Sequence, residues 1–166
     1  FVLRTIEAVA PRNGFRLDIE SEFSSEWGFG SSAAVCVATA AVLRAMDGHA
    51  FDRAAIFETA LSAVRAVQGR ASGADVAAAT YGGIVLYRAD PLSIEPFVRH
   101  LPLSAVYAGY KTPTPEVIAL VEARRREFPE LHQRIFQAMD ACVLEAAGAL
   151  RGGDPDRLRP SHRSAL

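Results

Sequence analysis

The chain has 166 residues, of which 50% are hydrophobic and 22% are charged, and its formal net charge at pH 7 is −1. This length predicts one domain or parts of two, with enough apolar residues for a substantial core. The balanced charge argues against nucleic acid as a partner, and the absence of an apolar run of about 20 residues argues against a membrane span. Cys36 and Cys142 lie in apolar helical patterns, which predicts free buried thiols and a cytoplasmic protein.

The first half of the chain is predicted to be mainly helical. Residues 2–10 have a helical pattern, whereas residues 15–19 alternate apolar and polar side chains, the period of a half-buried strand. A long apolar helix is predicted over 31–46, ended by an Asp-Gly pair. Asp52 is expected to cap the next helix, which runs to about Val67.

The second half is predicted to contain both strands and helices. Strands are expected over 84–87, 94–98 and 106–110, the first of them directly after a Gly-Gly pair. Because proline is tolerated in the first turn of a helix, helices are expected over 112–128 and 129–152. Together these elements predict the α+β class.

Two glycines and two serines, at positions 28–32, lead directly into the helix predicted over 31–46. Glycine adopts backbone angles that are closed to other residues and lets a ligand approach the main chain. The first N–H groups of a helix lack intrahelical partners and carry the positive end of its dipole, which favours bound phosphate. The alternative is that Ser31 or Ser32 is only an N-cap.

A second Gly/Ser turn opens the small-residue helix that follows it. Ser72-Gly73-Ala74-Asp75 is followed by an alanine-rich segment that ends in Tyr81-Gly82-Gly83. In one interpretation Ser72 and Asp75 form a capping box, which would stabilise the helix and do nothing else. In the other, Asp75 lies beside a phosphate site and orients or deprotonates a substrate hydroxyl.

The two stretches, in this order, resemble the motifs of the GHMP kinases, a superfamily that includes galactokinase, homoserine kinase, mevalonate kinase and phosphomevalonate kinase. The stretch from Gly28 to Ala34 is similar to the family's Gly-Leu-Gly-Ser-Ser-Ala-Ala loop, with Phe29 in place of leucine. The second turn with its Tyr-Gly-Gly, and the segment from Tyr110 to Val117, resemble the branch of the mevalonate and phosphomevalonate kinases.

The resemblance implies a kinase that uses ATP and Mg²⁺ and transfers the γ-phosphoryl group to an alcohol, as mevalonate kinase does. The phosphorylated acceptor of phosphomevalonate kinase and a sugar acceptor are the alternatives within the superfamily. Asp75 would act as base or electrostatic anchor, and Ser32 would hold the metal. The implied ATP-binding residues are Gly28, Phe29, Gly30, Ser31, Ser32 and Ala33; the implied substrate-binding residues are Ser72, Gly73, Lys111 and Thr114.

The chain also departs from the family pattern. Val64 stands where mevalonate kinases carry a metal-binding glutamate, the first and third family motifs are missing, and Lys111 is the only lysine. We therefore expect an internal portion of a two-lobed kinase, incomplete at both ends and inactive alone. Residues 1–92 would belong to the ATP-binding lobe and 93–166 would begin the C-terminal lobe. A non-catalytic binding remnant is the alternative from another class, and a homodimer is left open.

Overall fold

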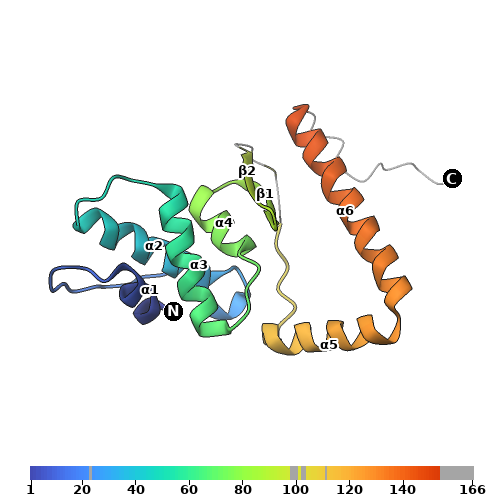
Figure 1. Ribbon diagram of the computed structural model, residues 1–166, viewed down its shortest axis with the longest axis horizontal. Coiled ribbons are helices and arrows are strands. Elements are labelled where there is room, and N and C mark those ends of the chain that lie inside the picture. The colour runs from blue at the N-terminus through green and yellow to red at the C-terminus, as the bar shows by residue number, and fades with distance from the viewer. Residues whose placement is uncertain (23, 98–100, 102–103, 111, 154–166) are drawn as a thin grey trace. The chain divides into compact units, whose positions relative to one another are not determined.

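The computed structural model describes residues 1–22, 24–97, 101, 104–110 and 112–153. Helices dominate this part of the chain, and a two-stranded sheet accompanies them (Figure 1). The elements in chain order are α1 (Val2–Val9), the 3-10 helix η1 (Ser25–Trp27), α2 (Ser31–Met46), α3 (Arg53–Gln68), α4 (Ala74–Tyr81), β1 (Ile84–Ala89), β2 (Leu92–Phe97), α5 (Thr114–Glu127) and α6 (Pro129–Arg151).

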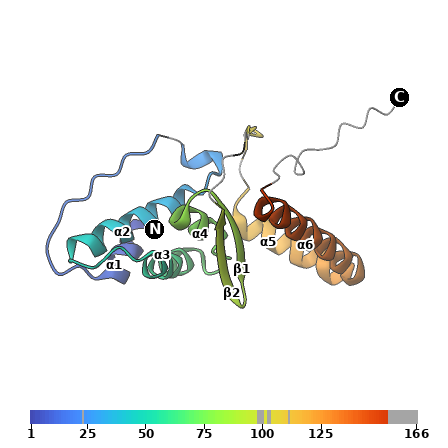
Figure 2. The same cartoon turned by 90° about the horizontal axis from the view of Figure 1, so that it is seen from above.

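The chain divides into two compact units. One comprises Phe1–Pro96 with Val106–Lys111, and the other comprises Phe97–Ala105 with Thr112–Leu166. In the first unit α1, α2 and α3 pack against one another, α4 packs on α2 and α3, and β1 packs on α4 (Figure 2). The starts of α2 and α4, where the two Gly/Ser turns lie, are therefore held by one body.

Small and apolar side chains form the core of the first unit. Alanine lets helix backbones approach closely, and the larger side chains of α3 fill the remaining space because burial removes their apolar surface from water. The cluster contains Ala33 and Cys36 of α2, Phe57, Ala60, Leu61, Ala63 and Val64 of α3, and Val76 and Ala77 of α4.

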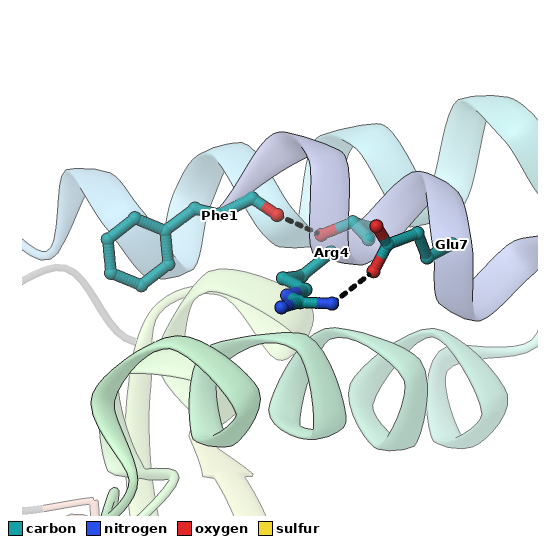
Figure 3. A network of polar contacts seen from close by, with 4 residues as sticks. Phe1, Arg4 and Glu7 are labelled. Atoms are coloured by element: carbon teal, nitrogen blue, oxygen red, sulfur yellow. Dashed lines mark hydrogen bonds and ion pairs between the residues drawn. The ribbon is translucent and has the colours of Figure 1, made fainter.

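Helix α1 is held mainly by packing. The buried Thr5 hydroxyl donates to the main-chain oxygen of Phe1 over 3.2 Å, which satisfies the one polar group that this residue brings into the core. The ion pair between Arg4 Nη1 and Glu7 Oε2, 2.7 Å long, is largely exposed (Figure 3). An exposed pair of this kind contributes at most about 1 kcal/mol.

The second unit is built on α5 and α6, which pack against each other. Proline stands in the first turn of both helices, as predicted. Arg124 and Arg125 make exposed ion pairs with Glu127 and Glu122 on α5. Cys142 is exposed on α6, so the expectation of two buried thiols is correct only for Cys36.

All the predicted helices are present, and two of the predicted strands are not. Residues 84–87 lie in β1 and residues 94–97 in β2, whereas 15–19 and 106–110 carry no strand. A strand is stabilised by hydrogen bonds to a neighbouring strand, and within the described residues only β1 and β2 pair. None of the described helices has the length and apolar character needed to cross a membrane.

Candidate functional site

The first Gly/Ser turn presents the start of α2 without a side-chain cap. Gly28 (φ 79°) ends η1, and Gly30 (φ 72°, ψ 28°) is the N-cap of α2; both adopt the left-handed conformation that glycine allows. Ser31 and Ser32 are the first two residues inside the helix, so the interpretation of either serine as the N-cap is wrong. The first-turn N–H groups of this 16-residue helix lack an intrahelical acceptor.

Side chains around this loop differ in what they offer to a ligand. Ala33 is only 2% exposed as a whole residue and packs in the core, so its side chain is not available to a ligand. Trp27 and Phe29 are 47% and 56% exposed, and their rings meet edge to face with centroids 6.0 Å apart. An exposed aromatic pair therefore lies directly beside the loop.

The second turn begins α4 at Gly73 rather than at Ser72. Gly73 (φ 96°) is the N-cap, and the Ser72 hydroxyl accepts the Ala74 N–H over 3.3 Å. Asp75 is thus the second residue of the helix, and the interpretation of Ser72 and Asp75 as a capping box is wrong. Its carboxylate is exposed and makes no hydrogen bond or ion pair with any residue in the described part of the chain.

The structure brings the loop and Asp75 together. An ideal Cβ placed on Gly30 would lie 3.7 Å from Asp75 Cβ and 4.0 Å from Asp75 Oδ2. Because Gly30 has no side chain, the Asp75 carboxylate lies beside the start of α2 with no side chain of residue 30 between them. The first-turn N–H groups of α2 are donors of the kind that bind a phosphate, and the carboxylate beside them is an oxygen ligand of the kind that a hard cation prefers.

The structure does not place the remaining predicted residues beside the loop. Val64 is 4% exposed and belongs to the core, so it supplies no metal ligand. Thr114 is the exposed first residue of α5 in the second unit, and Lys111 lies outside the described residues. Across the described ranges, no group of three or more His, Cys, Asp or Glu side chains is arranged to hold a metal ion.

One residue near the site was missed by the sequence analysis. The Tyr87 hydroxyl, on β1, donates to the main-chain oxygen of Ser72 over 2.5 Å. Alternation along β1 predicts which side chains share a face, but it carries no signal that one of them reaches the turn before α4.

The comparisons with known proteins agree with the motifs. Residues 1–83 match the family described as GHMP kinases N terminal domain. A mevalonate kinase of Archaeoglobus fulgidus is 39% identical over 145 residues, which cover 87% of this chain and 48% of that protein. A mevalonate kinase of Pyrococcus furiosus is 34% identical over 140 residues, which cover 84% of this chain and 42% of that protein.

A third relative, the mevalonate kinase of Thermococcus gammatolerans, is 30% identical over 164 residues, which cover 96% of this chain and 49% of that protein. The chain thus spans about half the length of the curated relatives it matches. No solved structure gives a significant match. The family match covers one half of the chain, residues 1–83, and includes both Gly/Ser turns. The chain therefore belongs to the GHMP kinase family.

Proposed function

We propose that the natural protein containing this chain is an ATP- and Mg²⁺-dependent kinase that transfers the γ-phosphoryl group to the hydroxyl of mevalonate. The observation that carries the proposal is the approach of the Asp75 carboxylate to the Gly30 position at the uncapped start of α2. Mevalonate is the acceptor to test first because the curated relatives reported above are mevalonate kinases.

The backbone of the first turn would hold the ATP phosphates. The N–H groups of Ser31, Ser32 and Ala33 are the first-turn donors of α2, and the helix dipole adds positive potential at the same end. The left-handed glycines at 28 and 30 keep side chains away from this approach. The geometry therefore supplies donors in fixed positions, which is most of what phosphoryl transfer requires of a protein.

A carboxylate this close to a phosphate site would repel the ligand unless a cation lies between them. Mg²⁺, when bound, neutralises phosphate charge, and it prefers oxygen ligands and keeps phosphates and waters in its shell. The residues that would hold it are Ser32, through its hydroxyl, and Asp75, through a carboxylate oxygen.

Asp75 has a second role in the proposed reaction. Its carboxylate is exposed at the start of α4, where it would orient the acceptor hydroxyl and accept its proton as the phosphoryl group arrives. Ser72, which is exposed, would contact the acceptor, whereas Gly73 is buried beside Tyr87 and would serve only the backbone of the turn. Lys111 and Thr114 would help to position the acceptor. The proposed lobes, 1–92 and 93–166, differ from the two compact units, because residues 93–96 and Val106–Lys111 belong to the first unit.

The test is an ADP-release assay on the natural full-length protein with mevalonate, phosphomevalonate and galactose as separate acceptors. We expect turnover with mevalonate and a loss of about 100-fold or more in kcat for Asp75→Asn, as removal of a general base produces. The melting temperature should stay within about 2 °C of wild type, because an exposed side chain with no partner among the described residues adds little stability. Binding of MgATP, measured by calorimetry, should persist but require more Mg²⁺, because Asp75 is one of the two proposed metal ligands.

Asp90→Asn is the matched control, since Asp90 is exposed in the turn between β1 and β2 and asparagine suits such a turn equally well. Its kcat should equal that of wild type. Turnover of phosphomevalonate or galactose instead of mevalonate would overturn the acceptor assignment. Full activity of folded Asp75→Asn would overturn the role of Asp75 and favour a non-catalytic or different site.

A further inference from the structure

Tyr87 connects the strand β1 to the turn that carries Asp75. Its ring lies 6.3 Å, centroid to centroid, from Phe57, a side chain that is 2% exposed in the core. Its hydroxyl donates to the main-chain oxygen of Ser72 over 2.5 Å. The ring is therefore anchored in the core while the hydroxyl holds the backbone of the turn.

Gly73 makes this contact possible. An ideal Cβ on Gly73 would lie 2.6 Å from the Tyr87 hydroxyl oxygen and 3.1 Å from Leu61 Cδ1. The Tyr87 hydroxyl thus occupies the space that any other residue's side chain at position 73 would require. Glycine is needed here both for the close approach and for the left-handed φ of 96°.

The hydrogen bond fixes the peptide group at which α4 begins. In a planar trans peptide the carbonyl and the N–H point in opposite directions, so holding the Ser72 carbonyl toward Tyr87 also sets the Gly73 N–H. The Gly73 carbonyl accepts the Ala77 N–H over 2.8 Å, the first bond of α4. Asp75 follows two residues after this N-cap, so its position depends on the same peptide group.

We propose that Tyr87 is a positioning residue that holds the Ser72–Asp75 turn in place for phosphoryl transfer. The inference rests on the proposed function. It assigns to a strand residue outside both sequence motifs the task of fixing the carboxylate that faces Gly30. Tyr87 acts through the backbone of the turn and makes no contact with the reacting groups in this proposal.

The test replaces Tyr87 by phenylalanine, which keeps the ring against Phe57 and removes the hydrogen bond alone. Tyr81→Phe is the matched control: Tyr81 packs against the same core, and its hydroxyl makes no hydrogen bond within the described residues. Two sets of measurements are made on the natural full-length protein. The first is amide hydrogen exchange of residues 70–78, and the second is kcat together with the KM and the calorimetric Kd for ATP.

For Tyr87→Phe we expect faster exchange in 70–78 and a kcat lowered about three- to tenfold, the loss of one hydrogen bond. The KM and Kd for ATP should change less than about twofold, since the uncapped start of α2 is untouched. Tyr81→Phe should match wild type in each quantity. A uniform rise in exchange over the first unit would indicate general destabilisation and overturn the proposal.

The remaining outcomes separate this inference from the proposed function. Unchanged exchange in 70–78 for Tyr87→Phe would show that the turn does not depend on the hydroxyl. Faster exchange with a kcat equal to that of Tyr81→Phe would reject a role in the reaction. Absence of turnover in the wild-type protein would overturn the proposed function, and the exchange data would still decide whether Tyr87 holds the turn.

Discussion

Gly30 occupies the position at which the start of α2 meets Asp75, and its missing side chain has two separable consequences. The left-handed backbone (φ 72°) costs a residue with a Cβ about 1–2 kcal/mol. The Cβ itself would lie 3.7 Å from Asp75 Cβ, at the start of α2 where the phosphate is proposed to bind. We expect Gly30→Ala to lower the unfolding free energy by about 1–2 kcal/mol and to weaken MgATP binding by about tenfold or more, as measured by chemical denaturation and calorimetry.

Gly48→Ala provides the control for backbone strain. Gly48 also has a positive φ, 79°, near the other end of the same helix, and nothing lies within 4 Å of its ideal Cβ. The two variants should therefore lose similar stability, while only Gly30→Ala loses affinity for MgATP. Equal MgATP affinities in the two variants would contradict the placement of phosphate beside Gly30.

For single residues, the sequence predicted the backbone conformations of the site more accurately than the hydrogen bonds between its residues. The glycines at 28 and 30 predicted a turn that side chains avoid, and both adopt positive φ angles. The serine caps, which the sequence left open as an alternative to a phosphate site, do not form because a left-handed glycine takes the N-cap position of both α2 and α4. Tyr87 gave no signal, since its contact with Ser72 depends on how β1 packs on α4.

Helix α3 supplies most of the core side chains of the first unit and begins at a side-chain cap. Asp52 Oδ1 accepts the N–H groups of Ala54 and Ala55 over 2.9 and 3.3 Å. Asp52→Ala should therefore lower the unfolding free energy by about 1 kcal/mol, whereas Asp52→Asn should keep nearly all of it because asparagine caps equally well. Equal unfolding midpoints for the two variants in urea would contradict this role.

The sequence predicted the helices more accurately than the strands. The reason is that a helix forms its hydrogen bonds within its own segment, whereas a strand forms them with another segment. The helix over 31–46 was predicted with its observed bounds because its ends are set by local glycine and aspartate residues. The strands predicted over 15–19 and 106–110 have the right alternation, but a strand also needs a neighbour that alternation cannot specify. Val106 is 94% exposed, which is consistent with a segment that no strand covers.

At the scale of the molecule, the first unit places both turns on one core, and this has a thermodynamic consequence. A ligand that binds only the folded state stabilises it by RT ln(1 + [L]/Kd), about 2.7 kcal/mol at a concentration of 100 Kd. MgATP that contacts the start of α2 and Asp75 of α4 should therefore raise the melting temperature of the natural full-length protein by several degrees. ATP with EDTA should raise it less, because the Asp75 carboxylate then faces phosphate without a cation.

Ser32→Ala isolates the metal contribution to this shift. Loss of one oxygen ligand should raise the Mg²⁺ concentration needed for half of the ATP-dependent stabilisation, by several-fold, and leave the melting temperature of the free protein close to that of wild type. Ser62→Ala, an exposed serine on α3, should leave the Mg²⁺ requirement unchanged. The measurement is a thermal-denaturation titration with Mg²⁺ at fixed ATP. An unchanged Mg²⁺ midpoint in Ser32→Ala would show that Ser32 is not a metal ligand. Identical shifts of the melting temperature by ATP with and without EDTA would contradict a metal ion between the phosphate and Asp75.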